Sequence, residues 1–164
     1  KTRIVKTAKD LDCIDGLILP SGESTAIGKF LDYFSLKEIL QQKIISGLPV
    51  FGTCAGLILL AKNIENQTNT HLATMDITVK RNGYGSQLDS FSTNLLIPTI
   101  DKNMPIPLVF IRATYITKTG KDVQILATLD NRIIAARQKN MLVSSFHPEL
   151  TCDLRFHQYF LSMI

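Results

Sequence analysis

The run Pro49-Val50-Phe51-Gly52-Thr53-Cys54-Ala55-Gly56-Leu57-Ile58 places one cysteine among small residues, with an apolar segment on either side. This is the pattern of a nucleophile elbow, in which a strand turns sharply into a helix. Gly52 and Gly56 allow the backbone to pack closely at such a turn. The thiol of Cys54 would then lie at a helix N-terminus, where the helix dipole favours the thiolate.

A candidate base and carboxylate come much later in the chain, in Phe146-His147-Pro148-Glu149. Pro148 biases His147 toward extended backbone, and in that geometry residues two apart point to the same side. Glu149 can therefore orient the imidazole of His147, which would act as a base toward Cys54. The three residues together indicate a Cys-His-Glu hydrolase.

Each nucleophile candidate also has a plainer interpretation. By residue type alone, a cysteine in an apolar run is more often an inert core residue than a nucleophile. The flanking glycines reverse that preference for Cys54, whereas Cys13 and Cys152 lack such a setting. Ser24 is a rival nucleophile without the Gly-x-Ser-x-Gly frame, so capping of a helix N-terminus is its expected role.

The composition indicates one globular domain. The 164 residues are 45% hydrophobic and 20% charged, enough for a full core. The net charge of +4 comes from scattered basic residues, so nucleic-acid binding is not indicated, and the apolar runs are too short for a membrane span. The three cysteines form no disulfide or zinc pattern, which favours a reducing, cytoplasmic setting.

The first half of the chain alternates strands and helices. Residues 15–19 form a buried strand that runs into a turn, and residues 25–34 read as a helix. Ser35 and Glu38 form a capping box for the next helix, which Gly47 ends. Strand, helix, strand and helix in this order predict an α/β sheet with parallel strands.

The second half is richer in strands. Asp130-Asn131 and Lys139-Asn140 are predicted hairpin turns. Residues 1–6 look like a further strand at the start, and residues 151–164 like a closing amphipathic helix. The predicted strands are Ile77–Lys80, Leu95–Pro98, Val109–Ile111, Val123–Thr128, Ile133–Arg137 and Leu142–Ser145.

Two polar regions have competing interpretations. The turn Pro20-Ser21-Gly22-Glu23-Ser24 can aim a backbone N–H at a developing oxyanion, but a plain turn or a phosphate cradle fits equally. Arg81 opens a glycine-punctuated loop, and Arg112 follows an apolar run. Each arginine could bind a carboxylate or form a surface salt bridge.

Together these stretches resemble one family, the glutaminase subunits of pyridoxal 5'-phosphate synthase, which are class I (triad-type) glutamine amidotransferases. The Gly-x-Cys-x-Gly and His-Pro-Glu pieces occur across amidotransferases, whereas the Arg-Asn-x-Tyr-Gly-x-Gln and Ile-Arg-Ala pieces are specific to this family. The matching segments are residues 15–25, 52–62, 76–87 with Ser90-Phe91, 110–113 and 145–151, in the family's order.

The resemblance implies a three-layer, flavodoxin-like α/β fold, mostly parallel with antiparallel additions in the second half. It also implies that Cys54 attacks the side-chain amide of L-glutamine, that His147 moves the proton and that Glu149 orients His147. The backbone N–H groups of Gly22 and Ala55 would form the oxyanion hole.

The implied glutamine pocket draws on the Gly-Glu-Ser turn and on two arginine motifs. No metal or organic cofactor is expected. The implied partner is a (β/α)8-barrel synthase subunit, which receives the ammonia within a large hetero-oligomer and activates the glutaminase by docking. The pocket residues are Gly22, Glu23, Ser24, Arg81, Ile111 and Arg112.

Three features depart from the family's pattern. Ser21 replaces the first glycine of the usual Pro-Gly-Gly-Glu-Ser, and it would be strained if that position needs a positive φ. Thr114 replaces the proline of Ile-Arg-Ala-Pro, a milder change in loop stiffness. Residues 1–164 are expected to form a single glutaminase domain without the family's first strand and helix, which would leave a sheet edge exposed.

Two other functions stay open from the sequence. One is another triad amidotransferase or a γ-glutamyl hydrolase, against which Arg81-Asn82 and residues 110–112 argue. The other is a non-catalytic relative that only binds and regulates the synthase. Ser21 and the short N-terminal region favour it, whereas the complete set of Cys54, His147 and Glu149 argues against it.

Overall fold

The computed structural model describes residues 1–81 and 90–164. The helices are α1 (Ser24–Tyr33), α2 (Lys37–Ile45), α3 (Ala55–Leu60) and α4 (Arg155–Leu161), with 3-10 turns η1 (Ala8–Leu11) and η2 (Pro148–Leu150). The strands are β1 (Leu17–Leu19), β2 (Val50–Thr53), β3 (Ala61–Ile64), β4 (Met75–Lys80), β5 (Phe91–Leu95), β6 (Ile106–Phe110), β7 (Tyr115–Thr119), β8 (Gln124–Leu129), β9 (Arg132–Gln138) and β10 (Met141–Ser144).

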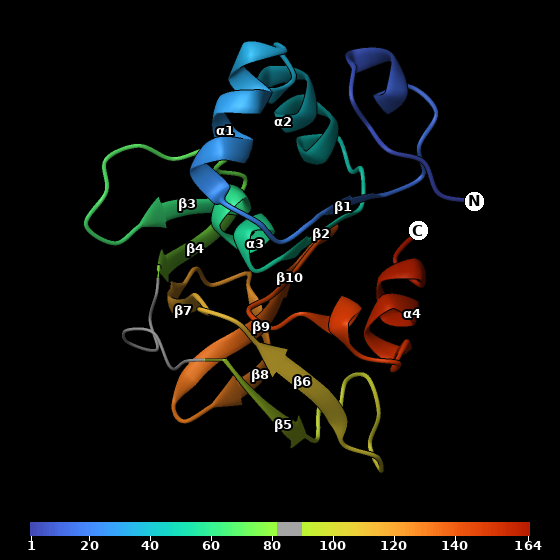
Figure 1. Cartoon of the computed structure of the whole chain (residues 1–164), viewed down its shortest axis with the longest axis vertical. Coiled ribbons are helices and arrows are strands. Elements are labelled where there is room, and N and C mark those ends of the chain that lie inside the picture. Colours follow the sequence, from blue (N-terminus) through green and yellow to red (C-terminus); the bar gives the residue numbers. More distant parts are fainter. Residues whose placement is uncertain (82–89) are drawn as a thin grey trace.

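The main sheet has a parallel part and an antiparallel part. Its order is β1-β2-β10-β9-β7-β4-β3, with β8 beside β9 (Figure 1). β1, β2 and β10 are parallel, as are β3 and β4, whereas β9 pairs antiparallel with β10, β7 and β8. β5 and β6 form a separate antiparallel pair. The predicted mixed α/β sheet is confirmed, although antiparallel pairing reaches further than the expected additions.

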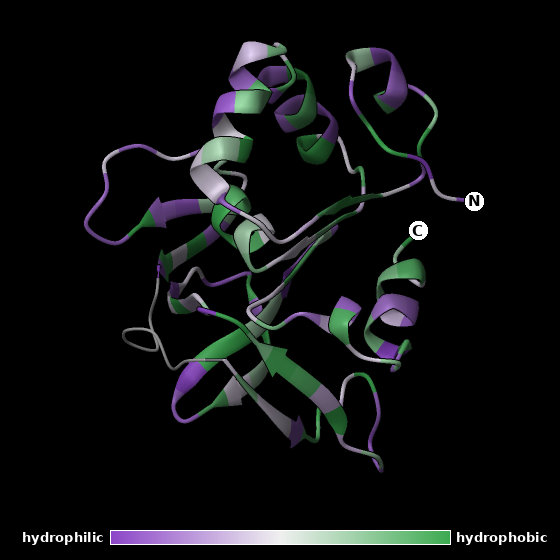
Figure 2. Cartoon of the chain, in the orientation of Figure 1, coloured by the Kyte–Doolittle hydropathy of each residue, from purple (hydrophilic) through white to green (hydrophobic). Residues whose placement is uncertain are grey.

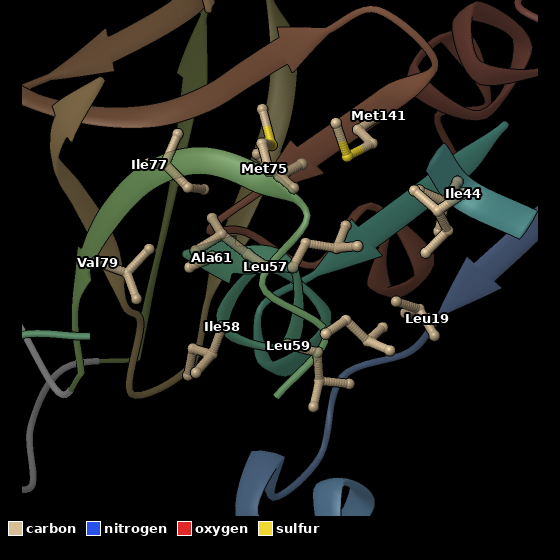
Figure 3. Close-up of a cluster of buried hydrophobic side chains, with 14 of the residues drawn as sticks. Leu19, Ile44, Leu57, Ile58, Leu59, Ala61, Met75, Ile77, Val79 and Met141 are labelled. Atoms are coloured by element: carbon tan, nitrogen blue, oxygen red, sulfur yellow. The ribbon is translucent and has the colours of Figure 1, made fainter. Parts of the chain in front are cut away.

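Helices cover both faces of the parallel part, which gives three layers. Successive residues of a strand point to opposite faces, and in β2 Val50 joins one buried cluster while Phe51 joins the other. The first cluster packs α1, α2 and α3 on the sheet, with Leu57 and Met141 among its members (Figure 3). The second cluster lies on the opposite face of the sheet, where Phe156 of α4 packs with side chains of β6. In Figure 2 the apolar colouring covers most of β6.

The elbow after β2 has the strained backbone that its sequence predicts. Cys54 takes φ 49° and ψ −96°, a backbone conformation that residues other than glycine rarely adopt. A Cβ on Gly56 would lie 2.2 Å from the carbonyl oxygen of Leu19, and one on Gly52 would lie 2.6 Å from the backbone of Gly56. The two glycines therefore let α3 approach β1 and β2 closely enough to form the turn.

The predicted capping box is wrong. Ser35 takes φ 54°, and the residue before α2 is Leu36, whose side chain makes no capping hydrogen bond. The chain closes α1 with a left-handed residue at Ser35 instead, and the backbone N–H of Leu36 donates to the carbonyl of Leu31 at 2.8 Å. The tight connection between α1 and α2 therefore outweighs the capping preference of Ser35 and Glu38.

Several strand predictions also need correction. Residues 1–6 form no strand in the structure, and 3-10 turn η1 follows them. The prediction at 95–98 comes too late, because β5 ends at Leu95, and β3 and β7 were missed. The predicted turns at Asp130-Asn131 and Lys139-Asn140 are confirmed, since Asp130, Asn131 and Lys139 all have positive φ between paired strands.

The closing helix is shorter than predicted. α4 packs Phe156 and Phe160 into the core, one helical turn apart, while Leu154, Leu161 and Ile164 stay exposed. Arg155 at its start binds Asp101 at 2.7 Å and the carbonyl of Met104 at 2.9 Å, which ties α4 to the segment between β5 and β6.

Gly56→Ala should destabilise the chain by about 3 kcal/mol, because the new Cβ meets a backbone carbonyl that cannot move aside. Gly47→Ala is the control. Its Cβ would meet nothing within 4 Å, so the only cost is that of holding alanine at a φ of 109°, about 1 kcal/mol. Urea unfolding measures both, and equal effects would contradict the close packing at Gly56.

Asp101 should support stability only above acidic pH. The backbone N–H groups of Asn103 and Met104, with the guanidinium of Arg155, lower the pKa of Asp101 from 3.8 to about 2. A carboxyl whose pKa falls on folding stabilises the fold above its unfolded pKa and loses that effect as the pH drops from about 4 to about 2. Asp101→Asn should therefore flatten the fall in unfolding free energy across this window, measured by urea titrations. An unchanged slope would contradict the assignment.

Candidate active site

The carboxyl ends of β1, β2 and β10 meet at one edge of the sheet, because the three strands are parallel and adjacent. The segments that follow them carry the Gly22 turn, Cys54 and His147. They surround a cavity of about 460 Å³, within the range usual for small-molecule sites. Its lining residues are Ser21, Gly22, Glu23, Ser24, Cys54, Ala55, Ile58, Arg81, Ile111, Arg112, Thr114 and His147.

Cys54 lies at the N-terminus of α3, as predicted, and its backbone N–H donates to the carbonyl of Ser144 at 2.8 Å. Its protonation differs from the prediction. Burial raises the pKa of the Cys54 thiol, and the charge of Glu149 adds to this, against the lowering effect of the backbone N–H groups of Ala55 and Thr114. α3 spans only six residues. The resting side chain is therefore a neutral thiol rather than a thiolate.

His147 is buried and held at both ends. Its backbone N–H donates to the carbonyl of Val109 at 2.8 Å, and its Nδ1 lies 3.0 Å from Oε1 of Glu149. Because a carboxylate only accepts hydrogen bonds, Nδ1 carries the proton and Nε2 is left as an acceptor. Nε2 is buried without a partner among the described residues, and His147 lines the cavity beside Cys54.

The pairing of His147 with Glu149 arises from a different backbone than predicted. Pro148 does not continue an extended segment but begins the 3-10 turn η2, in which Glu149 is the second residue. His147 just before it has φ −106° and ψ 86°. The turn folds the Glu149 side chain back toward the imidazole, so the contact forms without the extended geometry.

The turn after β1 combines one glycine with a helix cap. Gly22 takes φ 146°, so glycine is required there, whereas Ser21 is not among the residues with positive φ. The strain expected at Ser21 is therefore absent. Glu23, and not Ser24, caps α1, because its carboxylate accepts from the backbone N–H groups of Thr25 and Ala26. Burial alone would raise the pKa of Glu23, but these two N–H groups, together with the hydroxyl of Thr25 and the charge of Arg81, lower it.

Opposite charges meet at the rim of the cavity. Nη2 of Arg81 lies 2.9 Å from Oε1 of Glu23, although 58 residues separate them in sequence. Ile111 and Arg112 line the same cavity and are both exposed, and Arg112 takes φ 46° at the end of β6. The rest of the predicted glycine-punctuated loop, residues 82–87, lies outside the described residues.

Three cavity residues were not predicted as part of the site. Ile58 adds an apolar wall from α3, and the hydroxyl of Ser21 donates to Oε1 of Glu149 at 3.0 Å. Thr114 is buried, and its hydroxyl donates to the carbonyl of Lys80 at 2.6 Å. The departures at Ser21 and Thr114 were visible in the sequence, but their partners depend on contacts between distant segments.

Neither a metal centre nor a membrane segment appears in the part of the chain that the structure describes. No cluster of three or more His, Cys, Asp or Glu side chains is placed to hold a metal ion. No helix within residues 1–81 and 90–164 has the length and apolar character to cross a bilayer.

The chain closely matches known proteins. It is 54% identical over 164 residues to "Pyridoxal 5'-phosphate synthase subunit PdxT" of Carboxydothermus hydrogenoformans, covering 100% of this chain and 85% of that protein. The protein of the same name from Clostridium botulinum is 57% identical over 157 residues, covering 96% and 81%.

Solved structures agree with the fold. A structure described as "Crystal structure of glutamine amidotransferase" superimposes with a TM-score of 0.91 at 38% identity, covering 97% of this chain and 84% of that one. The glutaminase domain of a Trypanosoma brucei CTPS with bound acivicin gives a TM-score of 0.63 at 16% identity, covering 95% and 73%, and shows the shared fold alone. The sequence also matches the SNO glutamine amidotransferase family over residues 1–164. The chain belongs to the SNO glutamine amidotransferase family.

Proposed function

We propose that this chain hydrolyses L-glutamine to L-glutamate and ammonia through Cys54, His147 and Glu149. The observation that carries the proposal is the free Nε2 of His147, buried at the wall of the cavity that Cys54 also lines, with Nδ1 fixed by Glu149. A base with one open acceptor nitrogen beside a thiol is the arrangement that nucleophilic catalysis needs. Membership of the SNO glutamine amidotransferase family supplies the reaction class.

The reaction begins from the neutral thiol. Nε2 of His147 takes the thiol proton while Sγ of Cys54 attacks the side-chain amide carbon of glutamine. Glu149 stabilises the imidazolium that forms, since its carboxylate lies 3.0 Å from Nδ1. The imidazolium then protonates the amide nitrogen, ammonia leaves, and water hydrolyses the glutamyl thioester with His147 again as base.

Negative charge develops on the amide oxygen during both steps. We assign its stabilisation to the backbone N–H groups of Gly22, in the turn after β1, and Ala55, at the start of α3, two residues that line the same cavity as Cys54. Such fixed donors need no reorganisation as the charge appears, and losing one typically costs about 10²-fold in rate or more. Gly22 with φ 146° is the residue that sets the direction of its peptide unit.

The rim of the cavity suits a free amino acid. Glutamine carries both an ammonium and a carboxylate on its α-carbon, and the Glu23–Arg81 pair offers a partner of opposite charge to each. Ser24, Ile111 and Arg112 complete the pocket, and the hydroxyl of Ser24 is buried without a partner among the described residues. This donor can serve the substrate at no loss of an internal hydrogen bond.

We propose that the ammonia goes to a partner. The relatives in Carboxydothermus and Clostridium are called subunits of pyridoxal 5'-phosphate synthase. By this proposal the chain supplies ammonia for pyridoxal 5'-phosphate synthesis in the cytoplasm, to a (β/α)8-barrel synthase subunit within a hetero-oligomer.

Cys54→Ala should lower glutamate release from glutamine by at least about a thousandfold, because no other group replaces the attacking sulfur. The assay is run with and without a synthase subunit from a relative, and wild-type release should rise when the subunit is added. Binding of the subunit should survive the substitution.

Cys152→Ser is the matched control, because Cys152 is exposed and does not line the cavity. Its activity should equal that of the wild type. Glutamate release retained in Cys54→Ala would contradict the nucleophile. No release from folded wild-type chain with the subunit present would favour a regulatory relative instead.

The raised pKa of Cys54 predicts the pH dependence of its alkylation. In the Cys13→Ser/Cys152→Ser variant, the rate of reaction with iodoacetamide follows the thiolate fraction of Cys54 alone. A raised pKa delays the thiolate to higher pH, so the inflection in rate should lie above that of the same chain unfolded in urea. An inflection at or below the unfolded value would contradict a neutral resting thiol.

A further inference from the structure

One carboxylate oxygen of Glu149 accepts hydrogen bonds from two side chains, one nearby in sequence and one far from it. The hydroxyl of Ser21 donates to Oε1 at 3.0 Å across 128 residues of sequence, and Nδ1 of His147 lies 3.0 Å from the same atom. Ser21 belongs to the turn after β1, whereas His147 and Glu149 follow β10. The shared oxygen therefore joins two of the three segments that build the cavity.

Glu149 needs such support because its surroundings constrain it weakly. Its side chain is 37% exposed, and it sits in a 3-10 turn of three residues. Within residues 1–81 and 90–164, Ser21 and His147 are the hydrogen-bond partners of its carboxylate. A long, half-exposed side chain with one partner would sample several rotamers, whereas two donors from different directions select one.

Ser21 can make this contact without strain. The positive φ of the turn is taken by Gly22, and Ser21 is not among the residues with positive φ. A glycine at position 21 would have no side chain to reach Glu149. The serine therefore adds an interaction that a turn with two glycines lacks.

We propose that Ser21 is a positioning residue, whose hydroxyl holds the Glu149 carboxylate against His147 and ties the Gly22 turn to the catalytic triad. This inference rests on the proposed glutaminase function. Ser21 acts through Glu149 and not on the substrate, since its hydroxyl is engaged with the carboxylate. Its contribution is therefore to the chemical step, in which His147 must keep its orientation.

The test is a double-mutant cycle on glutamine hydrolysis with the synthase subunit present. Ser21→Ala should lower kcat about three- to tenfold, the size expected for one ordinary, solvent-exposed hydrogen bond, with KM little changed. Ser21→Thr keeps the hydroxyl and should restore most of the rate. In the Glu149→Ala background, Ser21→Ala should cause a much smaller loss, because the side chain through which Ser21 acts is gone.

The outcomes separate this inference from the function it rests on. An equal loss from Ser21→Ala in both backgrounds, or a loss confined to KM, would overturn the positioning role, as would full activity of Ser21→Ala. A wild-type chain that is folded and inactive would overturn the glutaminase proposal and the role of Ser21 with it. Unchanged melting temperatures of the Ser21 variants confirm that the cycle reports catalysis and not folding.

Discussion

The contact between α3 and the end of β1 is the constraint on which the site depends. A Cβ on Gly56 would come within 2.2 Å of the Leu19 carbonyl oxygen, so the helix backbone at Gly56 lies directly against the end of the strand. β1 runs directly into the turn that carries Gly22, and α3 begins immediately after Cys54. Cys54, the proposed nucleophile, and Gly22, a proposed oxyanion donor, are thereby held next to two elements that pack closely together.

Strain at the nucleophile is maintained by the sheet around it. A residue other than glycine at φ 49° and ψ −96° costs about 1–3 kcal/mol, which the surrounding contacts must offset. The backbone N–H of Cys54 bonds to Ser144 at the end of β10, the strand that leads to His147. This hydrogen bond continues the ladder between β2 and β10, so the elbow and the segment that carries the proposed base His147 follow neighbouring strands of one sheet.

Local patterns in the sequence predicted what local physics determines. The elbow around Cys54, the turn at Asp130-Asn131 and the position of α1 depend on neighbouring residues, and each appears in the structure. The proposed triad came from local patterns and the pocket residues from motif resemblance. In the structure Cys54, His147 and the pocket residues line one cavity, and Glu149 contacts His147 from behind.

What failed depends on distant contacts. The capping role of Ser35 yielded to helix packing, β7 forms only by pairing with β4 and β9, and the thiol of Cys54 is governed by burial more than by a helix of six residues. The bond between Ser21 and Glu149 spans 128 residues and has no local signal.

The protonated state of Cys54 affects how readily its sulfur is oxidised. A cysteine reacts with peroxides and other electrophiles as the thiolate. Oxidation beyond the sulfenic acid is not reversed by ordinary thiols. Because burial raises the pKa of Cys54, the site without substrate presents a poorly reactive thiol at neutral pH. By the proposed mechanism, the sulfur becomes reactive only when its proton passes to His147, so a site without substrate would be less open to oxidation than one that holds a thiolate.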